Sequence, residues 1–432
     1  MSEVPATVSG TSNLGVLMRF VATADWQLGM TARFLPAEAR VRFQQARFDA
    51  VRAIARVAVE RDAAFVLVCG DVFESNHLDR RVLSRAFEAL REFSMPVWLL
   101  PGNHDPLDAA SIFDSQHFRE SCPEHVHVLR TPGTHQVLPG VEVVAAPWSS
   151  KRPLSDLVAD ACGSLQRCDD VLRILAGHGA TDTLNPDHHD PATISTAALR
   201  RAIDDRCVHL AVLGDRHSTT QIAPGIWYPG APEVTDRREH DPGNVLVIDA
   251  EPNGSVRVES VHTGRWHFIA ESRHVGSADD VALLRRWLAA RPAKEQTGIW
   301  LSLTGTLSLT EFAELESVLQ DAHELFAHVE LWSRRTDLHV APNEHDLSRL
   351  GLTGFAAQTL DDLRATLDPR PATPLPSGAA GRDVCAAPIP ESAQLSEPLD
   401  TAALKRGDPD LEDPELAQAA LGLLYRLAGG AR

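Results

Sequence analysis

The sequence predicts an α/β fold for the first half of the chain, on three observations. Short apolar runs alternate with longer amphipathic segments from Leu17 to Leu213, as expected when helices cover a buried sheet. Several of these runs end in a polar cluster, which is typical of the edge where open α/β sheets bind ligands. The composition, 44% apolar and 23% charged residues among 432, is that of a folded protein of two or three domains.

The elements of this half follow from hydrophobic periodicity. Helices are predicted over Ala37–Glu60 and Leu78–Phe93, where apolar residues recur at helical spacing. Strands are predicted at six short apolar runs: Leu17–Thr23, Phe65–Cys69, Val97–Leu100, Val141–Ala145, Leu172–Ala176 and His209–Leu213.

The rest of the chain predicts a smaller α+β domain, an acidic linker and a C-terminal helix. A segment rich in Pro, Gly and charge starts at Trp227, and the strands Val245–Asp249 and Val256–Val261 behind it are assigned to the smaller domain. The terminal helix carries a leucine stripe that suits docking either on its own protein or on a partner. The predicted segments are a flexible N-terminus over 1–15, the α/β domain over 16–240, the smaller domain and following helix over 241–368, the flexible linker over 369–412 and the docking helix over 413–432.

Polar residues follow five of the predicted strands directly. These clusters are Asp25 and Gln27 in DWQLG, Asp71 and Glu74 in GDVFE, Asn103, His104 and Asp105 in GNHD, His178 in GHG, and Asp215 and His217 in GDRH. Each cluster alone is more simply a turn or a helix cap. At five successive strand ends, however, the side chains would meet at one sheet edge, where carboxylate, amide and imidazole groups can hold two divalent cations.

This ordered set resembles the five-motif signature of the calcineurin-like metallophosphoesterase superfamily. It is more closely similar to the SbcD-type DNA repair exonucleases, including an actinobacterial-type branch with DWQLG and GDRHS segments. The likeness runs from Leu17 to His217 and on into Tyr228–Glu233. The resemblance implies a sandwich of β-sheets flanked by helices, a smaller capping domain, and hydrolysis of phosphodiester bonds in DNA as exonuclease or endonuclease.

Taken position by position, the resemblance also implies two metal sites that share the Asp71 carboxylate. The first would be formed by Asp25, Gln27, Asp71 and His217. The second would be formed by Asp71, Asn103, His178 and Asp215.

The same resemblance assigns His104 to catalysis, facing the scissile phosphate, with Asp105 orienting it and Glu74 near the substrate. Gln27 and Asp215 stand where the family commonly has histidine. Three carboxylates and an amide oxygen make a hard donor set, which favours Mn²⁺, or Mg²⁺, over Zn²⁺. Two cations sharing a carboxylate would activate a bridging water, so no covalent intermediate is needed.

Arginines gather between Arg33 and Arg56, and Arg33 and Arg40 are the candidates for binding DNA phosphates. The alternative is an ordinary solvated helix face. The net charge of −18 argues against nonspecific coating of nucleic acid. The resemblance further implies a coiled-coil ATPase partner of the SbcC type, bound through the C-terminal region, and a homodimer. The chain shows no signal peptide pattern and no apolar run long enough for a membrane span, so a cytoplasmic location, at the nucleoid when on DNA, is expected.

Two other functions stay open on the sequence. One is a metallophosphoesterase that acts on small nucleotides or other phosphodiesters. The other is a weak or inactive DNA-binding or assembly subunit, in which Gln27 and Asp215 have cost the site its activity.

Overall fold

The computed structural model describes residues 17–185, 190–341, 357–359, 361–363 and 420. The chain forms two compact units. Unit 1 contains the chain up to Glu271 with Pro292–Trp300 and Leu325–Glu330, and unit 2 contains Ser272–Arg291, Leu301–Glu324 and the chain from Leu331. The predicted N-terminal segment 1–15 and linker 369–412 lie outside the described residues, as does the docking helix 413–432 apart from Ala420.

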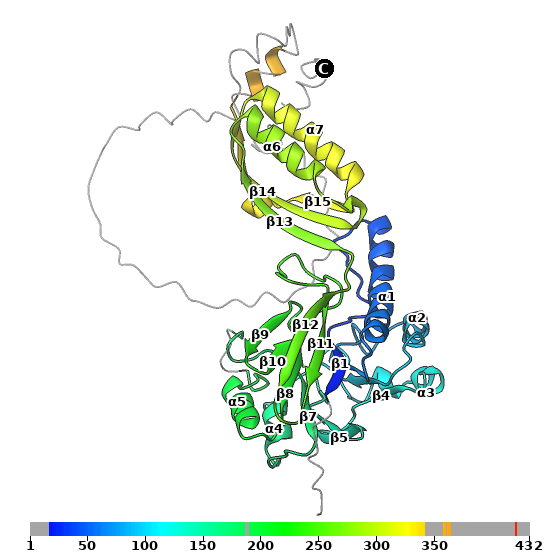
Figure 1. The fold of residues 1–432 in the computed structure, drawn as a ribbon. Coiled ribbons are helices and arrows are strands. Elements are labelled where there is room, and N and C mark those ends of the chain that lie inside the picture. The colour runs from blue at the N-terminus through cyan, green and yellow to red at the C-terminus, as the bar shows by residue number, and fades with distance from the viewer. Residues whose placement is uncertain (1–16, 186–189, 342–356, 360, 364–419, 421–432) are drawn as a thin grey trace, which may run out of the picture. The chain divides into compact units, whose positions relative to one another are not determined.

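Unit 1 is built on two six-stranded sheets (Figure 1). The first has the order β12-β11-β1-β2-β3-β4, with β1 Met18–Thr23, β2 Val66–Cys69, β3 Val97–Leu100, β4 Val126–Val128, β11 Asn244–Ala250 and β12 Val256–His262. The second has the order β5-β6-β7-β8-β10-β9, with β5 Gly133–Leu138, β6 Val141–Ala145, β7 Leu172–His178, β8 Leu210–Gly214, β9 Thr220–Ala223 and β10 Ile226–Tyr228. Strands β1 to β4 run parallel, and so do β6 to β8.

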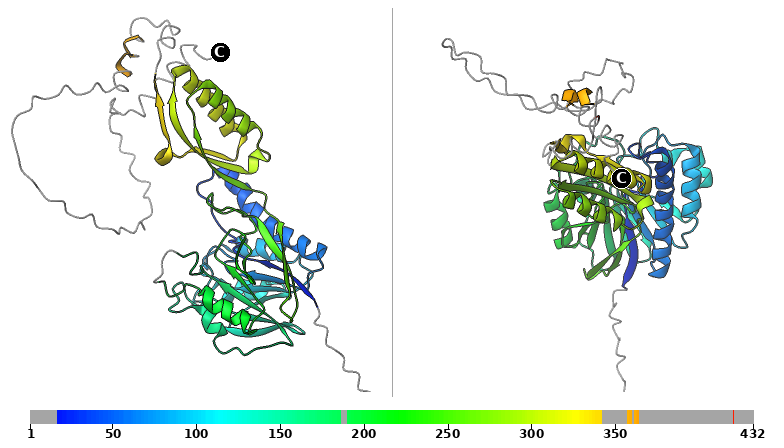
Figure 2. Two further views of the ribbon diagram at one scale, coloured as in Figure 1. Left: turned by 60° about the vertical axis from the view of Figure 1, so that its left-hand side comes forward. Right: turned by 90° about the horizontal axis from the view of Figure 1, so that it is seen from above.

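The two sheets pack face to face, and helices cover their outer faces (Figures 1 and 2). Side chains alternate along β1: Phe20 and Ala22 join a core shared with the second sheet, whereas Val21 packs beneath the helices. The helices on the first sheet are α1 Ala37–Glu60, α2 Arg80–Leu90 and α3 Gln116–Ser121, and those on the second are α4 Leu157–Cys162 and α5 Thr196–Asp204. Because both faces of the central strands are buried, their sequences are continuous apolar runs. The predicted fold class, β-sheets flanked by helices, is confirmed.

The structure divides the chain at a different place from the sequence analysis. Strands β11 and β12, expected in the smaller domain, belong to the first sheet, where β11 pairs antiparallel with β1 and Phe20 lies opposite Ile248. Unit 1 therefore continues to Glu271, beyond the predicted boundary at residue 241.

The remaining strands form a four-stranded sheet. The strands of this sheet are β13 His267–His274, β14 Thr297–Leu307, β15 His328–Leu331 and β16 Asp337–Val340. Helices α6 Ala278–Ala289 and α7 Leu309–Leu325 lie on one face of these strands, each burying an apolar stripe (Figure 2). None of the helices in the described ranges is long and apolar enough to cross a membrane.

Candidate metal centre

The loops that follow β1 and β2 run side by side and bring two carboxylates together. The Asp25 amide donates to the Gly70 carbonyl over 3.0 Å, and the Gln27 amide donates to the Asp71 carbonyl over 2.9 Å. From the opposite sheet, the Asp215 amide donates to both carboxylate oxygens of Asp25, each over 3.1 Å. The carboxyl ends of both sheets therefore meet at one place, as the polar clusters predicted.

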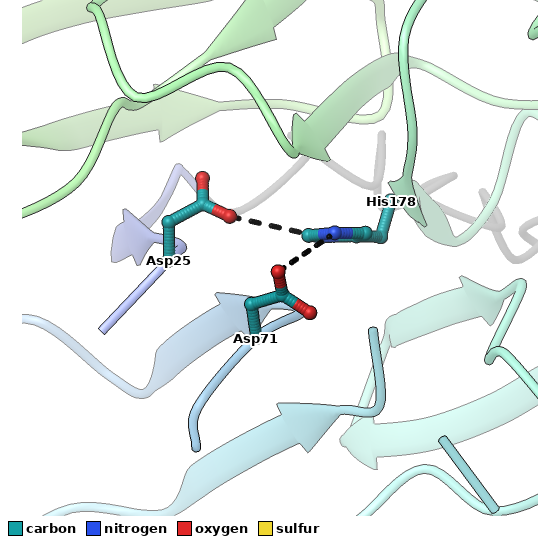
Figure 3. Close-up of side chains that lie close together, drawn as sticks. All are labelled: Asp25, Asp71 and His178. Atoms are coloured by element: carbon teal, nitrogen blue, oxygen red, sulfur yellow. Dashed lines mark ion pairs between the residues drawn. The ribbon is translucent and has the colours of Figure 1, made fainter. Parts of the chain in front are cut away.

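Asp25, Asp71 and His178 form the centre of this site (Figure 3). One potential ligand atom from each lies within 4.8 Å of the others, and all three side chains are buried. His178 Nδ1 lies 3.0 Å from the Cys69 carbonyl oxygen, which can only accept, so Nδ1 donates. Nε2 is left facing the site, 3.4 Å from Asp71 Oδ2 and 4.0 Å from Asp215 Oδ1.

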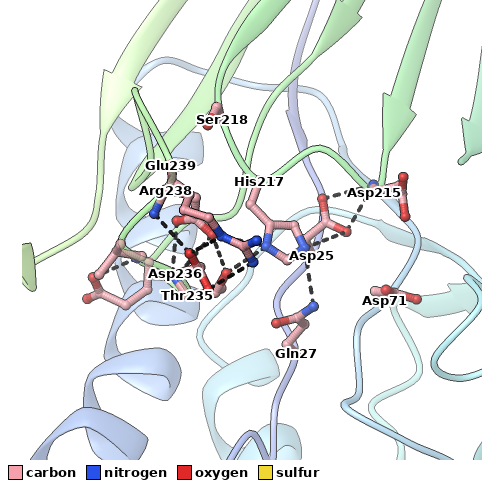
Figure 4. Close-up of polar contacts among 12 residues, drawn as sticks. Asp25, Gln27, Asp71, Asp215, His217, Ser218, Thr235, Asp236, Arg238 and Glu239 are labelled. Atoms are coloured by element: carbon pink, nitrogen blue, oxygen red, sulfur yellow. Dashed lines mark hydrogen bonds and ion pairs between the residues drawn. The ribbon is translucent and has the colours of Figure 1, made fainter. Parts of the chain in front are cut away.

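His217 flanks this centre and is held in the same way (Figure 4). Its Nδ1 lies 2.6 Å from Thr235 Oγ1 and 3.0 Å from Glu239 Oε1, and the carboxylate accepts the proton. Nε2 lies 4.0 Å from Asp25 Oδ1 and 3.2 Å from Gln27 Nε2. Gln27 thus lies in the site beside His217, with its amide nitrogen toward the ring.

Glu239 and Thr235 escaped the sequence analysis. They lie in the polar segment that was interpreted as a domain boundary. Their distance from His217 along the sequence does not indicate a contact, because the contact forms only when the loop folds back onto the ring.

Asn103 and His104 of the GNHD turn both lie beside Asp71, but they make different contacts. Asn103 Oδ1 lies 2.8 Å from His178 Nε2, and rotating the amide would instead let its nitrogen donate to Asp71 and His178. His104 donates from its backbone to Asp71 Oδ1 over 2.9 Å and from Nδ1 to the Glu74 carbonyl over 2.9 Å. Its side chain is 38% exposed, and Nε2 lies 3.9 Å from Asp71 Oδ2.

Asp105 holds the turn itself. Its fully buried carboxylate accepts from the Gly102 amide over 2.8 Å and from the Phe73 amide over 3.0 Å. The contact that positions the His104 ring comes from the Glu74 carbonyl, not from the Asp105 carboxylate expected to orient it.

The carboxyl and imidazole groups perturb one another because they share a buried space. Burial raises the pKa of Asp25 to about 6. Burial alone would lower the pKa of both histidines, but the carboxylates outweigh it. Asp71 is the main group raising the pKa of His178 well above its usual range, and Glu239 the main group raising that of His217 to about 9. The buried carboxylates carry negative charge that divalent cations would neutralise if they replaced the histidine protons. The oxygen and nitrogen atoms of these residues therefore fit divalent metal ions.

The backbone beneath the donors is strained. Asp25, Gln27, Asp71 and Asp215 have φ of 54°, 43°, 51° and 93°, in the region that favours glycine. Such conformations persist only where the surroundings enforce them, and they gather at functional sites. The neighbouring Gly102 is required for space, since a Cβ there would lie 2.2 Å from Asp71 Oδ1.

Two of the arginines around α1 donate hydrogen bonds to backbone carbonyls within the protein. Arg47 is buried in unit 1 and donates to the carbonyls of Asp25, Trp26 and Val234, so it cannot line a phosphate track. Arg40 donates to the carbonyls of Arg33 and Leu35 and so holds the loop before α1. Arg33 itself is exposed.

Comparison with known proteins agrees with this geometry. Residues 18–218 match the family model of the calcineurin-like phosphoesterases. The matched segment covers the strands from β1 to β8 and every residue assigned to the metal centre by sequence.

A curated relative is the uncharacterized metallophosphoesterase YhaO of Bacillus subtilis (strain 168), 30% identical over 264 residues. The match covers 58% of this chain and 62% of YhaO, less than two thirds of that protein. Among solved structures, TT1561 of Thermus thermophilus is similar with a TM-score of 0.37 and 12% identity, over 57% of this chain and all of that one. Purple acid phosphatase PPD1 of yellow lupin (Lupinus luteus) is similar with a TM-score of 0.36 and 14% identity, over 58% of this chain and 52% of that one.

Proposed function

We propose that this protein is a metal-dependent DNA nuclease of the SbcD type, which hydrolyses phosphodiester bonds as the nuclease subunit of a DNA repair complex. The observation that carries the proposal is the meeting of Asp25, Asp71 and His178 from two sheets at one buried point, with His217 beside them. The likeness of the ordered motifs to SbcD-type exonucleases supports DNA as the substrate.

The donors present fit two divalent cations. The first would be held by Asp25, Gln27, Asp71 and His217, and the second by Asp71, Asn103, His178 and Asp215. The donor set is hard, which supports Mn²⁺ or Mg²⁺. When bound, such cations supply a nucleophile at neutral pH and neutralise charge on the phosphodiester.

His104 is the residue that we assign to the leaving group. Because Nδ1 donates to the Glu74 carbonyl, Nε2 carries a proton only in the imidazolium form. That partly exposed nitrogen can then give its proton to the leaving oxygen or donate to the phosphate. Asp71 accepts from the His104 amide, so the same turn fixes both the shared carboxylate and the acid.

Turnover of linear DNA tests the proposal. Purified protein with Mn²⁺ should degrade linear DNA, and His104→Ala should lower kcat by about 10²- to 10⁴-fold while metal content, measured by mass spectrometry, is kept. His117→Ala, on α3 beside Ser84 and Ser121, is the matched control and should keep full activity. Hydrolysis of small nucleotides alone would replace the nuclease by a nucleotide phosphoesterase. Bound metal and DNA binding without any turnover would indicate an assembly subunit.

Association with a coiled-coil ATPase of the SbcC type through the C-terminal region belongs to the same proposal, together with a homodimer and a cytoplasmic location at the nucleoid. Its support is the motif likeness and the leucine stripe of the predicted helix. Deleting residues 370–432 should leave hydrolysis of a small phosphodiester intact and abolish co-purification with the ATPase. Unchanged co-purification would overturn this assignment.

A further inference from the structure

A cavity of about 450 Å³ lies against the metal centre. It is lined by the metal-site residues Asp215 and His217 and by polar residues of the neighbouring loops. Those loop residues include Arg216, Asp236, Arg238 and His240. Its volume is within the range of small-ligand sites, so it has room for one nucleotide step beside the scissile phosphate.

The acidic groups of the cavity are already engaged. Glu239 is bound to His217, and Asp236 accepts from Arg238 Nε over 2.8 Å and from a terminal nitrogen of Arg238 over 3.2 Å. Asp215 is a predicted metal ligand, and its charge would be neutralised there. The arginines and the His240 ring are therefore the groups left to meet a ligand, and the arginines are the ones that are always charged.

Arg216 and Arg238 have donors to spare. Arg216 is half-buried, and its Nε donates to Thr220 Oγ1 over 2.9 Å, which fixes the guanidinium plane. Among the residues described, neither terminal nitrogen of Arg216 has a hydrogen-bond partner. The Arg238 side chain is 82% exposed, and its second terminal nitrogen likewise has no partner in the described part of the chain. Planar arginine forks match phosphate oxygens in two-point contacts.

We propose that Arg216 and Arg238 bind the phosphate next to the scissile one, so that this cavity selects a nucleic-acid strand over an isolated phosphodiester. This inference rests on the nuclease function proposed above. Both arginines would act as positioning residues, because they hold the strand and do not touch the reacting atoms.

Two short substrates isolate the additional phosphate. A thymidine dinucleotide has one phosphodiester and no flanking phosphate, whereas the trinucleotide has two phosphodiesters. With Mn²⁺, wild-type protein should show a kcat/KM about tenfold higher for the trinucleotide. Arg216→Gln and Arg238→Gln should bring this ratio close to one, mainly through KM. Arg200→Gln, an exposed residue of α5, should keep the wild-type ratio.

Binding without turnover gives a second readout. In EDTA, fluorescence anisotropy with a labelled thymidine oligonucleotide should show weaker binding by both variants. The slope of log K against log salt should be smaller by about 0.7 for each lost phosphate contact on a single strand. Asp236→Asn removes the carboxylate that competes with the phosphate for Arg238, so this variant should bind the oligonucleotide more tightly. A misfolded variant would instead bind it more weakly.

The outcomes separate the two proposals. If wild-type protein cleaves both substrates but the arginine variants keep its ratio and its salt slope, the cavity assignment is overturned and the nuclease stands. If wild-type protein cleaves neither substrate yet hydrolyses a mononucleotide ester, both proposals fall.

Discussion

The two histidines of the metal centre each use Nδ1 for a fixed partner and keep Nε2 for the site. His178 donates to the Cys69 carbonyl, and His217 donates to Glu239, which also accepts from the Thr235 hydroxyl. Such partners fix the ring orientation and make the free nitrogen a better donor to a cation. Glu239 therefore belongs to the candidate metal centre together with the residues expected to bind the cations.

Replacing Glu239 by Gln should lower Mn²⁺ affinity by about 10- to 100-fold, because the His217 ring loses its charged partner. Isothermal titration calorimetry of the metal-free protein measures the change. Glu259→Gln, on the surface of β12 and paired with Arg61, is the control and should bind like wild type. Equal affinities for both variants would show that Glu239 has no part in metal binding.

Metal binding should release protons at neutral pH. Without a cation, the pKa of His217 is raised to about 9 and that of His178 lies well above its usual value. Both rings therefore carry a second proton at pH 7, in the imidazolium form. A cation must displace them, so Mn²⁺ affinity should rise with pH up to about 9 and fall as pH decreases. Calorimetry at pH 7 in buffers of different ionisation enthalpy should detect release of about one to two protons. Heats that do not depend on the buffer would contradict this.

At the scale of elements, α1 supports the metal centre from behind. Arg47 on this helix reaches the loop after β1, where its guanidinium binds the carbonyls of Asp25 and Trp26, and it also reaches Val234. These carbonyls are buried, so each needs a donor. The helix thereby holds the strained backbone of Asp25 in place.

Arg47→Met should destabilise the protein by about 3 kcal/mol, because several buried carbonyls lose their donor at about 1–3 kcal/mol each, less the relief of removing a buried charge. Arg47→Lys should not restore stability, since one ammonium cannot reproduce the planar fork. Chemical denaturation measures both. Arg52→Met on the same helix removes only a partly exposed pairing with Asp49 and Glu92, and should cost under about 1 kcal/mol. A similar loss in both helix variants would refute the special role of Arg47.

The turn after β3 is the second supporting element. Gly102→Ala would place a Cβ 2.2 Å from Asp71 Oδ1, so the shared carboxylate must move. We expect Mn²⁺ affinity to drop at least about tenfold, a loss of about 1.4 kcal/mol or more. Gly163→Ala, at the end of α4, meets its nearest atoms at 3.5 Å and should leave affinity unchanged. Wild-type affinity in Gly102→Ala would show that the turn can shift without moving the Asp71 carboxylate.

At the scale of unit 1, the candidate metal centre joins the two sheets of the sandwich. Asp25 and Asp71 follow strands of the first sheet, whereas His178 and Asp215 come from β7 and the end of β8 in the second. A cation bound to both sets adds a link between layers that otherwise meet through apolar side chains. Metal binding is thus coupled to the stability of the folded domain.

Mn²⁺ at about 100 times its dissociation constant should add about 2.7 kcal/mol of stability. For a domain of this size, that raises Tm by about 5–10 °C, as calorimetry would measure. EDTA should reverse the shift. Asp71→Asn should show almost none, because the carboxylate expected to serve both cations is gone. An equal shift in this variant would mean that the metal binds elsewhere.

Much of this fold could be predicted because its central strands and α1 are long and strongly patterned. The range predicted for the first helix, 37–60, is the observed α1. The sheet to which β11 and β12 belong could not be predicted, since a strand sequence does not specify its long-range partner. The meeting of Asp25, Asp71 and His178 could be predicted because each lies at or just beyond the end of a strand. Glu239 and Arg47 were not recognised as supports, since their contacts arise only when the chain folds back on itself.

The spread of these residues along the polypeptide also dictates the order of assembly. Glu239 must be synthesised before His217 has its carboxylate partner. Both sheets must also pack together before Asp71 and His178 can bind one ion. A divalent cation held by residues of both sheets would therefore not nucleate this fold in the way that zinc nucleates a finger. It would bind only after both sheets have docked, so a nascent chain that ends before His178 would lack the site.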